Sequence, residues 1–276
     1  MLSTPTAWAT EIEQWEQWMR APGRAESTRY LRTYHLRRLG HDHPNLTPRT
    51  ITYDHLIVWM AGKDWKPQTR RGYRSSLRQF FAWMHATGRT PVNIAYDLPT
   101  ISVPRSLPRP APDQVVLDAV ARSDARTRLM IVILTETGIR RGELAKIHTT
   151  DVEPDLTGWS LRVQGKGGRE RVVPLSDALA RVIRRMPPGY LFPGQIGGHL
   201  SPAHCGVLVS RSLDDGWTAH KLRHRFATFA YDLERDIRAV QELLGHANIQ
   251  TTTIYTLVPK GSMRRAAAAA SLGIAA

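Results

Sequence analysis

Apolar and aromatic residues recur at three- and four-residue intervals along most of this chain, which is the spacing of one face of an α-helix. In the first hundred residues this pattern predicts helices near 6–20, 27–39, 52–62 and 67–87. Two of these helix faces are marked by large side chains: Trp8, Trp15 and Trp18 lie on one face, and Leu77, Phe80, Phe81 and Met84 lie on another. We interpret these aromatic residues as the core of a small helical bundle rather than as platforms for stacked bases.

The second half of the chain follows the helical pattern with one interruption. Segments 159–163 and 170–174 alternate polar and apolar residues around a glycine-rich turn, which predicts a β-hairpin with Lys166 at or near its tip. Helices are predicted at 112–122, 125–137, 141–148, 176–186, 202–213, 219–231, 236–244 and 249–257, and in the Ala-rich tail near 264–270. The expected fold class is mainly α (α+β), a helical bundle followed by a mostly helical domain with a small antiparallel β-sheet.

A proline-rich stretch separates the two halves. Residues 98–112 contain five prolines, each of which restrains itself and its predecessor to extended geometry. A chain of 276 residues is also longer than one small core usually holds. We therefore expect a helical domain over 1–98, a linker over 99–112 and a second domain over 113–276.

The charge of the chain points to an anionic partner. Lys and Arg number 38 against 24 Asp and Glu, a formal net charge of +14, while a hydrophobic content of 42% favours a folded protein. A folded, strongly basic protein most often meets nucleic acid, although a basic surface can also serve solubility. Five cations recur at three- and four-residue spacing with no acid between them: Lys66, Arg70, Arg71, Arg74 and Arg78. We favour a helix face that follows DNA phosphates over a merely solvated face.

Other sequence features bear on location. The one cysteine, Cys205, excludes an intrachain disulfide and a cysteine-rich zinc site, and fits a reducing cytoplasm. The N-terminus lacks a signal-peptide pattern, and no uncharged apolar run reaches the length of a membrane span. We expect a soluble protein of the cytoplasm with no membrane partner.

The first segment with possible chemistry is TGIRRGEL, residues 137–144. Gly138 ends the preceding apolar helix, and Arg140 opens the next one near amide groups that favour anions. An arginine there presents a planar fork to a phosphate. The alternative is an Arg140 that pairs with Glu143 or stays in solvent.

The second is the glycine-rich hairpin turn. Gly165, Gly167 and Gly168 let the backbone approach a ligand closely, and the ammonium of Lys166 could reach the leaving oxygen of a phosphodiester. An ordinary turn is the alternative. The G-x-x-x-x-G-K-[ST] spacing of a P-loop is absent.

The third is HKLRHR, residues 220–225. His220 and Arg223 share a helix face, where the histidine suits proton acceptance and the arginine suits phosphate charge. A zinc site on His220 and His224 is an alternative, but Lys221 stands where a zinc hydrolase needs a glutamate.

The fourth joins His246 to Tyr255 near the C-terminus. His246 alone would more often end a helix than catalyse, and most tyrosines are packing residues. In contrast, His35, His41 and His43 are interpreted as surface residues around a turn. Two arginines, a lysine, two histidines and a tyrosine together suit a pentavalent phosphoryl transition state, whose negative charge needs prearranged cations. The tyrosine needs a base and a positive field to react near neutral pH.

In this order the motifs resemble those of tyrosine recombinases of the phage-integrase and Xer class. The matching segments within residues 135–257 are TGIRRGEL, VQGKGGRERVVPL, HKLRHRFAT and LLGHANIQTTTIYT. The resemblance implies these roles: Tyr255 as nucleophile, Arg140 and Arg223 as phosphate clamps, Lys166 as acid, His220 as base, His246 as a further phosphate contact and Glu143 as the residue that orients the site.

The resemblance also implies the reaction. A DNA-binding domain over 1–98 and a catalytic domain over 113–276 would clamp double-stranded DNA at short inverted-repeat core sites. Strands would be cut and rejoined through a 3′-phosphotyrosyl intermediate and a Holliday junction within a tetramer, with neither metal nor cofactor. A phage or prophage integrase and a Xer-like resolvase both fit, and an accessory directionality factor is among the partners the resemblance allows. The alternatives are a non-catalytic DNA-binding protein, a metal-dependent nuclease or transposase, and a type IB topoisomerase-like strand transferase.

Overall fold

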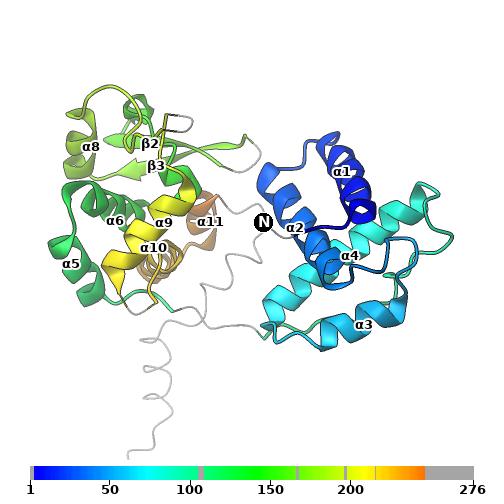
Figure 1. Ribbon diagram of the computed structural model, residues 1–276. Coiled ribbons are helices and arrows are strands. Elements are labelled where there is room, and N and C mark those ends of the chain that lie inside the picture. Colours follow the sequence, from blue (N-terminus) through cyan, green and yellow to red (C-terminus); the bar gives the residue numbers. More distant parts are fainter. Residues whose placement is uncertain (1–2, 105–108, 166–167, 196–197, 215, 246–276) are drawn as a thin grey trace, which may run out of the picture. The chain divides into compact units, whose positions relative to one another are not determined.

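The computed structural model divides the chain into two compact units, Met1–Ser106 and Leu107–Ala276 (Figure 1). It describes residues 3–104, 109–165, 168–195, 198–214 and 216–245. Three residues expected at the site, Lys166, His246 and Tyr255, lie outside the described residues, as do the helix expected at 249–257 and the tail. The division falls within the proline-rich stretch.

The first unit is a helical bundle. Its helices are α1 (Thr6–Arg20), α2 (Glu26–Asp42), α3 (Tyr53–Ala61) and α4 (Pro67–Ala86). Local signals set two of the starts. The Thr52 side chain accepts the backbone N–H of His55 ahead of α3, and Pro67 occupies the first turn of α4, where its missing N–H costs nothing.

The core of this unit is aromatic. Trp8 and Trp15 of α1 are fully buried against Phe80 of α4, with ring centroids 6.3 and 5.2 Å apart. Trp18 does not join them and is 47% exposed, contrary to the prediction of one shared face. Seven residues return almost to the same side of a helix, whereas ten residues end about 80° away from it.

His35 is also placed differently from its prediction as a surface residue. It is buried in the bundle, shares a 2.8 Å hydrogen bond with Ser76 Oγ and stacks on the Tyr73 ring at 3.9 Å. Burial, followed by the nearby charge of Arg32, lowers the pKa of His35 to about 4. It is therefore a neutral core residue at neutral pH.

The described part of the second unit is mostly helical with one small sheet, so the predicted fold class is confirmed. Its helices are α5 (Asp113–Arg122), α6 (Ala125–Thr137), α7 (Arg141–Leu144), the 3-10 turn η1 (Thr149–Asp151), α8 (Asp177–Arg184), α9 (Pro202–Leu213), α10 (Ala219–Glu234) and α11 (Ile237–Leu244). The antiparallel sheet has the order β1 (Val152–Pro154), β2 (Trp159–Gln164) and β3 (Glu170–Leu175). Strands β2 and β3 confirm the predicted hairpin.

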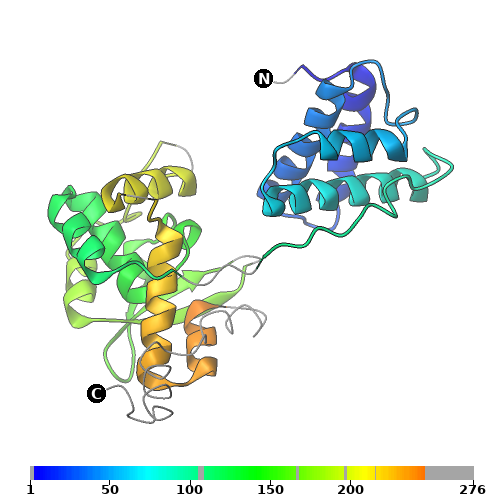
Figure 2. The same cartoon turned by 90° about the horizontal axis from the view of Figure 1, so that it is seen from below.

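Helix α6 lies at the centre of this unit. It contacts α5, α9, α10 and β3, and its residues Met130, Ile131 and Leu134 are fully buried. Its N-terminus is capped by Asp124, which accepts the backbone N–H groups of Arg126 and Thr127. Helix α11 packs against α10 and β3, and Figure 2 shows α10 and α11 side by side. These contacts bring the end of α11 to the sheet and to the end of α6.

Helix α7 is shorter than the segment 141–148 predicted as helical. It ends at Leu144, a turn over Ala145 and Lys146 follows, and the Ile147 carbonyl then accepts the N–H of Leu191 at 2.8 Å. Because Leu144 and Ile147 are both buried, the apolar spacing continues after the helix has ended. Among the residues that the structure describes, no helix is both long enough and apolar enough to cross a bilayer.

Candidate active site

The turn between α6 and α7 sets the position of Arg140. Gly138 ends α6 in the left-handed conformation with φ of 61°, and its N–H donates to the Leu134 carbonyl at 3.1 Å. A Cβ atom at this position would lie 2.2 Å from Cδ1 of Phe226. Only glycine meets both the backbone and the space requirement, and the turn places Arg140 directly ahead of α7.

A buried carboxylate, Glu143, holds Arg140. Its Oε2 accepts the backbone N–H of Arg140 at 2.7 Å, and its Oε1 accepts Nη1 at 2.9 Å. The pairing with Glu143 that the sequence left open is therefore present, while the Arg140 side chain remains 38% exposed. Burial opposes ionisation of Glu143, but hydrogen bonds from Arg171 and Arg140 outweigh it and hold the pKa below its ordinary value.

Arg171 is a member of this cluster that the sequence analysis did not single out. Its Nη1 and Nη2 donate to the two oxygens of Glu143 at 2.9 and 2.8 Å, a bidentate ion pair. The signal was its place in β3, where it alternates in phase with buried Val173 and Leu175. An arginine on the inward face of a strand requires a buried partner.

Arg223 is buried within α10 and connects the C-terminal ends of two other helices. Its Nη1 donates to the Gly138 carbonyl at 2.6 Å, and its Nη2 donates to the Leu244 carbonyl at 2.6 Å. The side chain thus joins the end of α6 to the end of α11, and its guanidinium is fixed by backbone atoms.

Three arginines converge on the last carbonyls of α11. The contacts are Arg171 Nε to Leu243 at 2.9 Å, Arg223 Nη2 to Leu244 at 2.6 Å and Arg140 Nη2 to Gly245 at 3.1 Å. The last carbonyls of a helix lack intrahelical donors and form the negative end of its dipole, so arginine is a suitable partner. The structure thus brings the two predicted clamps, Arg140 and Arg223, to one place, directly before His246 in the sequence.

His220 lies in the first turn of α10, next to this cluster. Its ring stands at 4.4 Å from the ring of His224. Partial burial and then the charges of Arg223, Lys221 and Arg140 lower the pKa of His220. The same kind of surroundings lowers the pKa of His224 to about 4. Both rings are therefore neutral at pH 7, the state in which a histidine accepts a proton.

The hairpin reaches the cluster through Gly165, the residue before Lys166. Its N–H donates to the Arg169 carbonyl at 2.7 Å. A Cβ atom on Gly165 would lie 3.6 Å from Glu143 Oε1 and 3.8 Å from Arg171 Nη1. The arm of the hairpin that leads to Lys166 therefore lies beside the carboxylate that holds Arg140.

The basic residues of α4 have different fates. Arg70 donates to the carbonyls of Met60 and, at 2.7 Å, Lys63, and Arg74 donates twice to the Leu98 carbonyl, at 3.0 and 2.6 Å. These two side chains fasten α4 to its own unit. Arg78 lies over the ring of Tyr96 at 5.9 Å, and the two exposed members of the run are Lys66 and Arg71.

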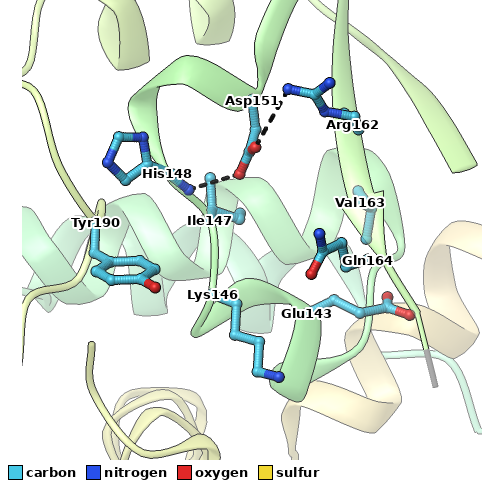
Figure 3. A pocket seen from close by; sticks show the side chains of 9 residues that line it. All are labelled: Glu143, Lys146, Ile147, His148, Asp151, Arg162, Val163, Gln164 and Tyr190. Atoms are coloured by element: carbon cyan, nitrogen blue, oxygen red, sulfur yellow. Dashed lines mark hydrogen bonds and ion pairs between the residues drawn. The ribbon is translucent and has the colours of Figure 1, made fainter. Parts of the chain in front are cut away.

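A pocket of about 210 Å³ opens next to Glu143 (Figure 3). Its other carboxylate, Asp151, accepts the backbone N–H of His148 at 2.8 Å and pairs with Arg162 at 4.0 Å. Both carboxylates of the pocket thus already have cationic or N–H partners. Within the described ranges, no group of three or more His, Cys, Asp or Glu residues is arranged to hold a metal ion.

Residues 113–261, about half of the chain, match the phage integrase family. The chain belongs to the phage integrase family. Over 244 residues, which are 79% of this chain and 80% of the relative, it is 31% identical to tyrosine recombinase XerD of Pseudomonas putida. Together these similarities identify the protein as a tyrosine recombinase, an enzyme of site-specific recombination.

Solved structures show the same fold. The recombinase resembles a lambda integrase dimer bound to a COC′ core site, with a TM-score of 0.73 and 19% identity over 90% of this chain and 76% of that one. It also resembles XerH site-specific recombinase bound to its palindromic difH substrate in a post-cleavage complex, with a TM-score of 0.69 and 24% identity over 87% and 79% of the two chains.

Proposed function

We propose that this recombinase cuts and rejoins double-stranded DNA at short inverted-repeat core sites, with the arginine cluster at the end of α11 as its phosphate-binding site. The observation that carries the proposal is the convergence of Arg140 and Arg223 on adjacent carbonyls, Gly245 and Leu244. Two guanidinium groups fixed side by side suit the two non-bridging oxygens of one phosphodiester.

In the proposed cleavage step, the Tyr255 hydroxyl attacks the scissile phosphorus while His220 accepts its proton. The bond between phosphorus and the 5′-oxygen breaks, and Lys166 gives that oxygen a proton. The products are a 3′-phosphotyrosyl link and a free 5′-hydroxyl, so atoms and charge balance. A 5′-hydroxyl from the partner duplex then reverses the step, which conserves the energy of the phosphodiester bond.

The arginines act on the charge that develops during this step. Negative charge grows on the phosphoryl oxygens as phosphorus becomes pentavalent, and donors that are already oriented stabilise it without reorganisation. Arg140 and Arg223 meet that requirement because backbone carbonyls and Glu143 fix them before any DNA binds. His246, the residue that follows Gly245 in the sequence, would add a further phosphate contact.

The first unit would supply a second grip on the duplex. Its exposed cations Lys66 and Arg71 suit contacts to phosphates, which position a protein on DNA without reading its sequence. We assign the recognition role to residues 1–98 and the chemistry to residues 113–276. As the family resemblance implies, the reaction would proceed through a Holliday junction in a tetramer, on the nucleoid in the cytoplasm. An accessory factor would set its direction.

The decisive experiment tests the nucleophile. The Tyr255→Phe variant should bind core-site DNA but form no covalent adduct with a nicked suicide substrate. The substitution removes the nucleophilic hydroxyl and keeps the aromatic ring. Tyr231→Phe, in a partly buried tyrosine of α10, is the matched control and should form the adduct at the normal yield. A normal adduct with Tyr255→Phe means that another residue attacks. Relaxation of supercoils without a partner site would instead place the chain with the type IB topoisomerases.

A further inference from the structure

We propose that Arg171 is a positioning residue of this recombinase and that, through Glu143, it fixes the direction in which Arg140 meets the scissile phosphate. The proposal rests on the proposed function, since it concerns the phosphate-binding site described above. It assigns no contact between Arg171 and the DNA.

The hydrogen bonds around Glu143 show how the effect would be transmitted. Oε1 accepts from Arg140 Nη1 and Arg171 Nη1, both at 2.9 Å. Oε2 accepts from the Arg140 backbone N–H at 2.7 Å and from Arg171 Nη2 at 2.8 Å. A carboxylate has about four lone-pair positions. Arg171 and Arg140 occupy them in equal number, so neither arginine can turn without moving the carboxylate that holds the other.

Arg171 is enclosed in a way that suits this role. Its side chain is only 12% exposed, and its Nε is bonded to the Leu243 carbonyl. Gly245, with φ of 62°, makes room for it, since a Cβ atom there would lie 2.9 Å from Arg171 Nη1. In Figure 3 the Glu143 carboxylate points away from Tyr190, at the far side of the pocket. Because the Arg171 guanidinium is largely buried, it acts on the carboxylate from within the protein.

Arg140 needs this support because it is the more exposed partner. A long arginine side chain with 38% exposure has many rotamers to choose from, and within the described part of the chain Glu143 and the Gly245 carbonyl restrict them. Loss of Arg171 would remove two of the four hydrogen bonds that orient the buried carboxylate and leave only the two from Arg140. The clamp would then lose its preset direction, although Arg140 itself is intact.

The test compares Arg171→Lys with the wild type in single-turnover cleavage of a suicide substrate. Lysine keeps the charge and loses the planar fork, so cleavage should slow by about 10- to 100-fold, by analogy with the range seen when residues that orient metal ligands are replaced. The protein concentration at half-saturation should stay within about twofold, because the exposed phosphate contacts are unchanged. An unchanged cleavage rate would overturn the proposal.

A substrate with sulfur in place of the 5′-leaving oxygen separates two routes. Sulfur needs no proton, so it should restore cleavage by Lys166→Ala but not by Arg171→Lys. If the sulfur substrate restored the cleavage rate of the Arg171→Lys variant, Arg171 would act through the hairpin and Lys166, and the route through Glu143 would be refuted. In addition, the double variant Glu143→Gln/Arg171→Lys should be no slower than the slower single variant, whereas additive losses would show independent roles.

Controls keep a folding defect apart from the proposed effect. Arg122→Lys alters an Arg–Asp ion pair elsewhere in the same unit and should leave cleavage unchanged. If Arg171→Lys does not fold, Gly245→Ala displaces the guanidinium without removing it, and the same loss that sulfur does not restore is expected. A wild-type protein that forms no adduct at all would contradict the proposed function instead, before Arg171 is tested.

Discussion

The turn at Gly138 offers the sharpest test of how the fold supports the site. Gly138→Ala adds one methyl group at a position where φ is 61° and where the new Cβ would lie 2.2 Å from Phe226 Cδ1 and 2.7 Å from Cγ. Neither problem can be relieved alone. The backbone cannot leave the left-handed region without moving Arg140, and the ring cannot leave without opening the interface between α6 and α10.

Two terms set the expected magnitude. A side chain in the left-handed region costs about 1–2 kcal/mol, and forcing a methyl group into a packed contact costs about 1–3 kcal/mol. The free energy of unfolding of the second unit should therefore fall by about 2–5 kcal/mol. Arg223 Nη1 donates to the Gly138 carbonyl, so cleavage should fall together with stability.

The assay is urea unfolding followed by amide hydrogen exchange in α6 and α10, which reports the second unit alone. Gly216→Ala is the matched control, because Gly216 has φ of 76° but nothing within 4 Å of the new methyl group. It should lose only about 1–2 kcal/mol, the backbone term. Phe226→Leu should recover part of the Gly138→Ala loss in a double-mutant cycle. A Gly138→Ala loss no larger than that of Gly216→Ala would refute the steric argument.

Three further outcomes follow from the charges. Because the folded pKa of Glu143 lies below its ordinary 4.5, the ionised carboxylate stabilises the fold above that pH, and this contribution is lost as pH falls through the folded value. Glu143→Gln should lower the free energy of unfolding by about 3–5 kcal/mol at pH 7 and weaken its dependence on pH in the acid range. An unchanged dependence would contradict this. Lys221→Gln removes a cation that lowers the pKa of His220, so the acid limb of the cleavage rate should move to higher pH, and an unmoved limb would remove His220 as the base. Lys66→Gln and Arg71→Gln should each reduce the slope of log DNA affinity against log salt by about one, whereas Arg70→Gln should lower stability instead; equal effects of all three would mean that the carbonyl bonds of Arg70 do not restrain it.

The sequence predicted the helices best where a local signal marks their ends. Helix α6 has the predicted bounds because Asp124 caps its start and Gly138 ends it, and α9 begins at Pro202 after the Ser201 cap. Helix α7 had no such end signal. Its chain leaves the helix to pair with residues 190–191, and that long-range contact carries no local mark in the sequence. Strand β1 was missed because three residues are too few to show a period.

The site was predicted unevenly for a related reason. Motif order indicated Arg140, Glu143, His220 and Arg223, and the structure brings these four residues together. The sequence alone could not distinguish the arginines that hold the fold from those left for a ligand, because the tertiary fold determines which partner a long side chain meets. Arg70 and its neighbour on the same face, Arg74, were expected on phosphates but bind carbonyls of their own unit.

The carbonyl partners of the cluster explain how a site with one acid can stay cationic. An ordinary way to order a buried arginine is an ion pair, but each added carboxylate would cancel the charge that a phosphate needs. Among the residues that the structure describes, Arg140 and Arg171 share the carboxylate of Glu143. Arg223 is held instead by neutral carbonyls at the ends of α6 and α11, and the other two arginines also bond to carbonyls at the end of α11. The negative end of the α11 dipole amounts to only about half a charge. Three guanidinium groups therefore keep a net positive charge while each is held in place, so the end of a helix orders these arginines without neutralising them.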